Sequence, residues 1–198
     1  MQQDFDDKYN KAIALAVQEH KSFYGEYPYI CHLLQVERTI QNFLLGDPCF
    51  SSILGQLRIA AILHDILEDT QVSKSTLDEM FGHEIADIVF AVTNESGKNR
   101  AEKFEKTSVK IRGNALATIL KLADRISNYT NCIKQYNSNN TNNLLKMYDK
   151  ESARFKELIQ VSDYTEYGIG DCILNMWEIL DILVEEGKYC LNKIEKVE

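Results

Sequence analysis

Apolar residues recur at intervals of three and four along almost the whole chain, and little interrupts this spacing. Only two prolines and nine glycines occur among the 198 residues. Such spacing places apolar side chains on one face of an α-helix, whereas a half-buried strand requires strict alternation of apolar and polar residues. The sequence has no alternation of useful length and no glycine pattern typical of a Rossmann fold or a P-loop. It therefore predicts an all-α fold.

Breaks in the apolar spacing divide the chain into successive helices. We expect helices at about 6–23, 29–45, 52–68, 85–92, 114–136, 144–160 and 171–187. Ser75 followed by Asp78 resembles a capping box and predicts a short helix that ends near Gly82. We expect 94–112 to be a loop with partial helix and the asparagine-rich run 137–143 to be a loop. The length favours one domain, 1–198.

Charge and cysteine content restrict the partners and the compartment. The formal net charge is −8, so no general attraction to nucleic acid or anionic lipid is expected. No apolar run approaches the roughly 20 residues that span a bilayer, and the polar segment 1–9 has no signal-peptide core. Five scattered cysteines without CxxC spacing are typical of reduced thiols. These features predict a cytoplasmic protein with no nucleic-acid or membrane partner.

The segment 60–70 carries the most chemical information. Its apolar stripe leads without a change of direction to His64 and Asp65, and one turn later to Glu68 with Asp69 beside it. Burial of an unpaired carboxylate costs several kcal/mol, so this change requires a compensating partner, and a divalent cation is the simplest one. We predict that His64 and Asp65 bind a metal ion, with Glu68 and Asp69 facing water or substrate beside it.

Two further positions show a similar pattern. The apolar stripe of the helix expected at 114–136 runs directly into Asp124, and His32 lies near the start of the helix expected at 29–45. Each has a simpler interpretation, because His32 can be a hydrogen-bonded core residue and Asp124 can pair with a neighbouring Arg or Lys. Together with His64 and Asp65, however, they form a plausible set of four metal ligands.

The order of His32, His64-Asp65 and Asp124 resembles the HD superfamily of metal phosphohydrolases. More closely, several phrases resemble the hydrolase domain of RelA/SpoT proteins and the stand-alone small alarmone hydrolases. These phrases are Pro28-Tyr29-Ile30 before His32, Leu63-His64-Asp65 with Glu68-Asp69-Thr70, Phe81-Gly82, Val92-Thr93, and Lys121 to Arg125 with Asn128. The resemblance covers about residues 8–160, so it implies an HD-type helical bundle followed by C-terminal helices at about 161–198.

The resemblance also implies an activity. Family members bind one Mn²⁺ through the residues that match His32, His64, Asp65 and Asp124, and those that match Glu68 and Asp69 orient and deprotonate a water. The reaction removes the 3′-pyrophosphate of guanosine tetra- or pentaphosphate and so lowers the alarmone of the stringent response. Ligand chemistry alone also allows Fe²⁺, Co²⁺ or Zn²⁺.

Candidate substrate contacts follow from the resemblance and from local charge. Between 98 and 112 lie six basic and two acidic residues, and Lys98 with Arg100 resembles a family segment whose lysine reaches substrate phosphates. Asn128 and Tyr148 resemble positions that contact the nucleotide. Each of these residues has the alternative of a solvated or structural position.

One departure from the family leaves alternatives open. An Arg-Lys pair that precedes the Pro-Tyr phrase in the family is missing here, and the segment 19–27 is about two residues shorter, with Lys21 as a partial substitute. The runner-up hypothesis is therefore an HD-type hydrolase of another nucleotide, such as an adenosine alarmone, NADPH or a nucleoside phosphate. A third is a catalytically silent nucleotide-sensing module, which the presence of both Glu68 and Asp69 disfavours.

Overall fold

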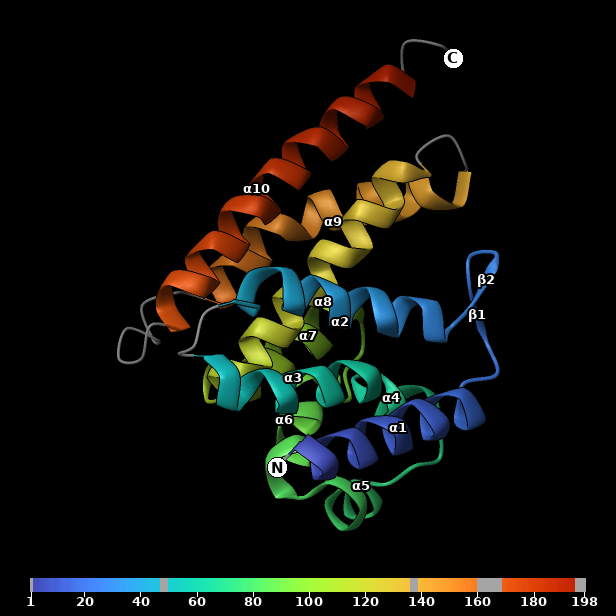
Figure 1. Ribbon diagram of the computed structural model, residues 1–198. Coiled ribbons are helices and arrows are strands. Elements are labelled where there is room, and N and C mark those ends of the chain that lie inside the picture. The colour runs from blue at the N-terminus through green and yellow to red at the C-terminus, as the bar shows by residue number, and fades with distance from the viewer. Residues whose placement is uncertain (1, 47–49, 136–138, 160–168, 195–198) are drawn as a thin grey trace. The chain divides into compact units, whose positions relative to one another are not determined.

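The computed structural model describes residues 2–46, 50–135, 139–159 and 169–194. Contacts divide the chain into two compact units, 1–121 and 122–198. The first unit contains most of the elements: α1 (Gln2–Glu19), β1 (Phe23–Tyr24), β2 (Tyr27–Pro28), α2 (Ile30–Leu44), α3 (Ser51–Leu63), α4 (Ile66–Asp69), α5 (Lys74–Phe81), α6 (His83–Val92) and α7 (Arg100–Arg112) (Figure 1). Helix α8 (Ala115–Lys134) continues into the second unit, which also contains α9 (Asn139–Leu158) and α10 (Ile169–Ile194). The predicted all-α fold is confirmed.

Helix α3 forms the centre of the first unit, where it packs against α1, α2 and α6. Its last turns are buried on every side, since Leu57, Ala60, Ala61, Ile62 and Leu63 have no exposed surface. This explains the almost continuous apolar run of the sequence, because a helix that is hydrophobic all round must be enclosed by other elements. The end of α3 is therefore held rigidly within the core.

The polar residues after this run lie in a turn, whereas the sequence analysis expected one helix over 52–68. Helix α3 ends at Leu63 and the short α4 begins at Ile66, with Asp65 at φ −98° and ψ −1° between them. Side-chain bonds anchor this turn, because His64 contacts the carbonyl of Ala61 and Asp65 accepts a hydrogen bond from Tyr29. The break separates His64 and Asp65 from the regular helix.

A small antiparallel hairpin joins α1 and α2, although no strand was expected. Phe23 pairs with Pro28 and Tyr24 with Tyr27. Gly25 adopts φ 62° in the turn, a left-handed conformation that glycine takes without steric penalty. The break expected between the helices at about 6–23 and 29–45 is thus a reversal of the chain.

The segment around α5 corrects one prediction. The cap of α5 is Ser73, whose hydroxyl accepts a hydrogen bond from the Thr76 amide, and not Ser75. The segment 94–112, expected to be a loop with partial helix, is non-helical at 94–99 and helical at 100–112, where the Asn99 side chain accepts from the Glu102 amide and caps α7.

The second unit consists of α9, α10 and the latter part of α8. Helix α9 begins at Asn139, so part of the asparagine-rich run expected to be a loop is helical, while 137 and 138 lie outside the described residues. Phe155 of α9 meets Trp177 of α10 edge to face, with ring centroids 5.5 Å apart. Within the described residues, no helix combines the length and the apolar character that crossing a bilayer requires. The single-domain organisation stays a prediction.

Candidate metal centre

Three of the four predicted ligands meet in the first unit. His32 comes from the first turn of α2, and His64 and Asp65 come from the turn that follows α3. One ring nitrogen of His32 and one of His64 lie within 4.8 Å of each other. The Oδ2 atom of Asp65 is 3.0 Å from Nε2 of His64 and 3.7 Å from Nε2 of His32. Both imidazoles are only 2% exposed, whereas the Asp65 side chain is partly exposed, at 19%.

The hydrogen bonding of His64 favours a cation in this cluster. Its Nδ1 lies 2.8 Å from the carbonyl oxygen of Ala61. A carbonyl oxygen only accepts, so Nδ1 carries the hydrogen and Nε2 presents its lone pair. That lone pair faces the Asp65 carboxylate at 3.0 Å, an arrangement that is repulsive unless a proton or a metal ion lies between the two atoms. A backbone-oriented histidine of this kind is typical of metal ligands.

The donor set fits a divalent transition metal. Two imidazole nitrogens and one carboxylate are suitable ligands for Mn²⁺, Fe²⁺, Co²⁺ and Zn²⁺. The predicted divalent metal site is thus supported by a cluster that can hold such an ion, and Mn²⁺ in particular stays a prediction.

Aromatic rings surround the cluster. The hydroxyl of Tyr29 donates a hydrogen bond of 2.6 Å to Oδ2 of Asp65. His20 stacks on Tyr29 at 4.8 Å, and Tyr24 of the hairpin stacks on His32 at 4.5 Å. Burial lowers the pKa of His20, although the charges of Asp65 and Asp69 oppose this effect. The sequence analysis did not assign a role to Tyr29, although its position one helical turn before His32 was an available signal.

Glu68 and Asp69 lie on α4, next to the cluster in the chain. Both oxygens of Glu68 accept hydrogen bonds of 2.7 Å from Asn94, one from the backbone amide and one from the side chain. Partial burial raises the pKa of Asp69 and the charge of Asp65 raises it further, whereas a hydrogen bond with Tyr29 lowers it. Asn94 is a contact that the sequence analysis missed.

Asp124 and Asn128 lie one turn apart on α8, in the second unit. Asp124 is 9% exposed, and its Oδ1 accepts a hydrogen bond of 2.6 Å from the side chain of Asn128. The neighbouring Arg125, one alternative partner for Asp124, forms its ion pair with Glu151 at 3.2 Å. The role of Asp124 as a ligand stays a prediction.

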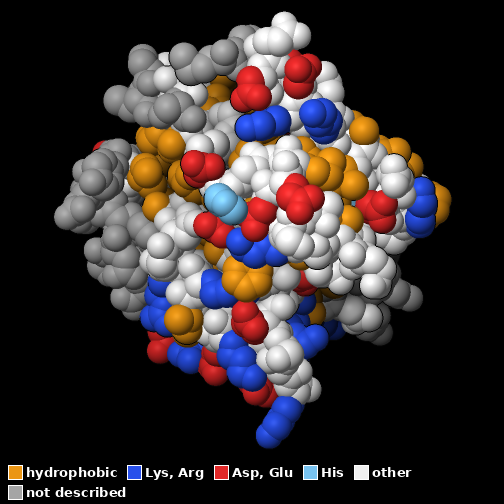
Figure 2. Space-filling view, turned by 90° about the horizontal axis from the view of Figure 1, so that it is seen from below, with side chains coloured by type: hydrophobic (Ala, Val, Ile, Leu, Met, Phe, Trp, Pro, Cys, Tyr) orange, Lys and Arg blue, Asp and Glu red, His pale blue; other side chains and the backbone are white. Residues whose placement is uncertain are grey.

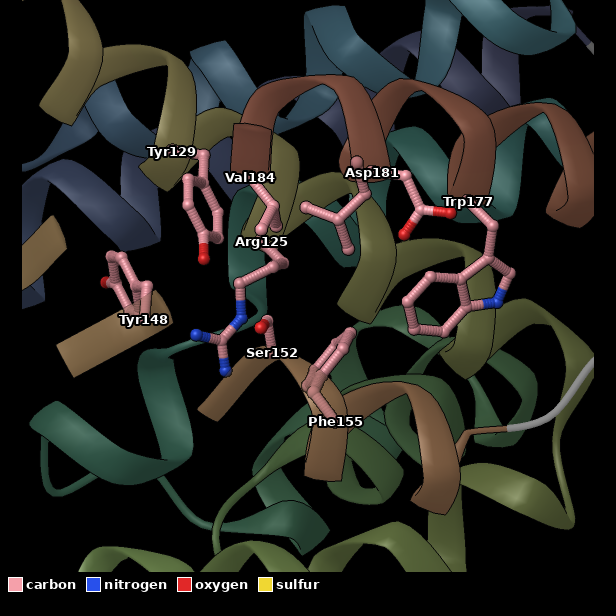
Figure 3. A pocket seen from close by; sticks show the side chains of 9 residues that line it. Arg125, Tyr129, Tyr148, Ser152, Phe155, Trp177, Asp181 and Val184 are labelled. Carbon is pink, nitrogen blue, oxygen red and sulfur yellow. The ribbon is translucent and has the colours of Figure 1, made fainter. Parts of the chain in front are cut away.

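Tyr148 belongs to an aromatic cluster within the second unit. Arg125 lies between the rings of Tyr148 and Phe155, with its guanidinium carbon 4.6 and 4.5 Å from their centroids. These side chains line a small pocket, which Figure 3 shows from close by. The ring of Tyr148 is thus largely buried against its neighbours, and its predicted contact with a nucleotide stays untested.

Ion pairs with acidic residues offset part of the positive charge of the basic segment 98–112. Lys106 pairs with Glu102 at 2.9 Å, and Lys110 pairs with Glu95 at 2.7 Å. Lys98 and Arg100 are exposed before and at the start of α7, and Lys21 is exposed between α1 and β1. Figure 2 shows a face on which Lys and Arg are interspersed with Asp and Glu. Only part of the predicted positive charge therefore remains available to an anion.

Comparisons with known proteins show which proteins the chain is similar to. No protein-family model matches the sequence. The chain is 33% identical to the guanosine-3′,5′-bis(diphosphate) 3′-pyrophosphohydrolase of Borreliella burgdorferi over 132 residues, which are 61% of this chain and 18% of that protein. It is 30% identical to the GTP pyrophosphokinase rsh of Brucella melitensis over 129 residues, 60% of this chain and 16% of that protein. The chain resembles one segment of the RelA/SpoT alarmone enzymes.

That resemblance, predicted from the motifs, is confirmed, and it extends to the fold. A solved structure of a metazoan SpoT orthologue, described as hydrolysing ppGpp, matches with a TM-score of 0.60 at 18% identity. The match covers 86% of this chain and 94% of that one, so the two share a helical fold. The chain spans less than a fifth of the length of the Borreliella and Brucella relatives.

Proposed function

We propose that this RelA/SpoT-like chain is a metal-dependent 3′-pyrophosphohydrolase of guanosine tetra- and pentaphosphate. It converts these alarmones to GDP or GTP and releases pyrophosphate. The observation that carries the proposal is the cluster of the two buried imidazoles of His32 and His64 with the carboxylate of Asp65. The names of the relatives, 3′-pyrophosphohydrolases among them, support this choice of substrate.

Asp124 is the fourth proposed ligand, and Mn²⁺ is the proposed ion. Support for Asp124 comes from its position at the end of an apolar stripe, its low exposure and its anionic oxygens. When bound, a divalent ion supplies Lewis-acid activation of water and neutralisation of phosphate charge. His32, His64, Asp65 and Asp124 would hold it in place.

Glu68 and Asp69 have distinct proposed roles. Glu68 is fixed by two hydrogen bonds from Asn94, which suits a carboxylate that orients a water molecule. Asp69 has a raised pKa, so it is a stronger base than an ordinary carboxylate and accepts the proton of that water. Once protonated, Asp69 is an acid that can return a proton to the 3′-oxygen of the leaving nucleotide.

Substrate phosphates require positive charge that the acidic chain provides only locally. We assign this role to Lys98 and Arg100, with Lys21 as a further contact, because all three are exposed. Asn128 and Tyr148 are the proposed nucleotide contacts. Asn128 also donates to Asp124, so it can link the proposed ligand to substrate position.

The test is incubation with guanosine tetraphosphate and Mn²⁺, followed by separation of the products. We expect pyrophosphate and GDP in equal amounts. Glu68→Ala and Asp69→Ala should abolish turnover without reducing bound metal, whereas the exposed control Glu178→Ala should behave as the unmodified protein. Survival of turnover in both site variants would contradict the assignment of water activation.

A second candidate is hydrolysis of another nucleotide by the same centre. The shortened segment between α1 and α2, which lacks the Arg-Lys pair, favours it, since this segment forms the hairpin next to the cluster. A panel of guanosine and adenosine polyphosphates, NADPH and simple nucleotides separates the two. Release of inorganic phosphate from simple nucleotides, with no pyrophosphate from any alarmone, would replace the first candidate with the second.

A further inference from the structure

Tyr29 connects the proposed metal ligand Asp65 with the aromatic rings behind it. Its hydroxyl donates a hydrogen bond of 2.6 Å to Oδ2 of Asp65. The acceptor Oδ2 is the same atom that lies 3.0 Å from Nε2 of His64. Tyr29 therefore contacts the one oxygen on which the cluster converges.

The position of Asp65 explains why such a contact is needed. Asp65 lies in the turn between α3 and α4, where the regular helix has ended. Its side chain is 19% exposed, whereas those of His32 and His64 are almost fully enclosed. Packing alone therefore fixes the two imidazoles better than the carboxylate. A hydrogen bond to one oxygen restricts rotation of the carboxylate and leaves its other acceptor positions for a metal ion.

The ring of Tyr29 is itself held from several sides. His20 stacks on it at 4.8 Å with the two planes inclined by only 15°, and Tyr24 meets it edge-on at 6.3 Å. The backbone amide of Tyr29 donates to the carbonyl of Ser22, which ties the start of α2 to the hairpin. These contacts keep the hydroxyl in one place.

His20 is buried, and it contacts Tyr29 through the face of its ring. It is 8% exposed, and neither of its ring nitrogens has a hydrogen-bond partner among the residues that the structure describes. The nitrogens of a buried imidazole normally form hydrogen bonds. The contact of His20 with Tyr29 is made instead by the stacked face of its ring. Its role is then to support the ring of Tyr29.

We propose that Tyr29 is a positioning residue that orients the Asp65 carboxylate for metal binding, and that His20 supports Tyr29 through its ring face. This inference rests on the metal centre of the proposed function. It does not depend on which nucleotide is the substrate.

The role of the Tyr29 hydroxyl is tested by comparing Tyr29→Phe with Tyr27→Phe. Tyr27 is an exposed tyrosine of the hairpin that precedes Tyr29, so it provides a matched change. Affinity for Mn²⁺ alone is measured by calorimetry, without nucleotide. Tyr29→Phe keeps the stacked ring and should weaken Mn²⁺ binding by about 10- to 100-fold, the usual effect of removing a group that orients a ligand. Tyr27→Phe should bind as the unmodified protein does. Equal affinity of the two variants for Mn²⁺ overturns the inference.

The support from His20 is tested by comparing His20→Phe with His20→Ala. Phenylalanine restores a flat ring without nitrogens, so His20→Phe should retain Mn²⁺ affinity, while His20→Ala should lose about tenfold or more. If His20→Phe binds Mn²⁺ as poorly as His20→Ala does, the nitrogens are needed and the ring-face role is wrong. Thermal unfolding of each metal-free variant shows that the comparison is made between folded proteins.

These measurements separate the inference from the proposed function. A protein that releases no pyrophosphate from alarmones, but whose Mn²⁺ affinity still falls in Tyr29→Phe, contradicts the function and supports the inference. Normal hydrolysis with unchanged Mn²⁺ affinity in Tyr29→Phe does the reverse. Failure of the unmodified protein to bind Mn²⁺ overturns both.

Discussion

Glu68 and Asp69 are adjacent in the sequence, yet their carboxylates have different surroundings. Asn94 donates to both oxygens of Glu68, which holds this carboxylate in one orientation. Asp69 is influenced instead by partial burial and by the negative charge of Asp65, both of which favour its protonated form. In the proposed mechanism, Glu68 is therefore the fixed carboxylate that orients the water, and Asp69 is the carboxylate that accepts its proton.

Removal of the Asn94 side chain should reduce turnover without affecting the metal. In Asn94→Ala, Glu68 keeps the bond from the backbone amide and loses the one from the side chain, so its carboxylate can rotate. We expect kcat to fall about tenfold, equivalent to roughly 1.4 kcal/mol, with little change in KM. Steady-state kinetics on guanosine tetraphosphate measure this, with the exposed α10 residue in Asn175→Ala as control. A change confined to KM would show that Asn94 binds substrate.

The raised pKa of Asp69 predicts a stability gain from Asp69→Asn. A carboxyl whose pKa is higher in the folded protein than in the unfolded chain destabilises the fold when it is ionised. The gain is therefore full above the folded pKa, declines as the pH falls through it, and vanishes below the ordinary value of 3.8. Urea unfolding with chelator at pH 7 and pH 4 measures the difference, with Glu178→Gln as control. A gain that grows toward pH 4 would have the wrong sign.

The sequence predicted those residues whose chemistry conflicts with a helical stripe. His64 and Asp65 were identified because an apolar face cannot end in such groups without a partner. Asn94 was missed because it lies 26 positions from Glu68, with no periodic relation between them. The stacking of His20 on Tyr29 could not be predicted, because it depends on the hairpin between α1 and α2. No alternation of apolar and polar residues indicated that hairpin.

At the scale of elements, helices were predicted well where the apolar spacing was strong and poorly where it was weak. The segment 94–112 was expected to be a loop with partial helix, but the bounds of α7 could not be predicted because most of its residues are polar and charged. Its folding depends on the cap from Asn99 and on ion pairs such as Lys106 with Glu102, which periodicity does not register. The break between α3 and α4 was missed for a related reason, since it depends on the contact of Asp65 with Tyr29.

Helix α5 offers a direct test of a corrected cap. The hydroxyl of Ser73 accepts from the amide of Thr76 at 3.1 Å, whereas the hydroxyl of Ser75 contacts the Ser73 hydroxyl at 2.8 Å. We expect Ser73→Ala to lower the free energy of unfolding by about 1 kcal/mol. Ser75→Ala, the matched control, should change it by a few tenths at most. Urea denaturation followed by circular dichroism measures both, and a larger effect at Ser75 would restore the sequence-based assignment.

At the scale of the whole molecule, the division into two units assigns the clustered side chains to one of them. His32, His64 and Asp65 all belong to the unit that comprises 1–121. The core of that unit is closed around α3, so the turn that carries His64 and Asp65 directly follows a well-packed helix. Periodicity predicts that such helices exist, but it carries no information on how contacts divide the chain, because that division depends on long-range packing.

Binding of a metal ion by the folded chain should stabilise the fold by mass action. An ion that binds only the folded form adds about 2.7 kcal/mol to the free energy of unfolding when its free concentration is a hundred times the Kd. We expect Mn²⁺ to produce this increase in urea unfolding, and excess chelator to abolish it. His64→Ala should show no increase, because it removes a buried nitrogen at the centre of the cluster. His83→Ala, which removes an exposed histidine paired with Asp78, should respond to Mn²⁺ as the unmodified protein does. The same Mn²⁺ response in both histidine variants would mean that the ion binds elsewhere on the chain.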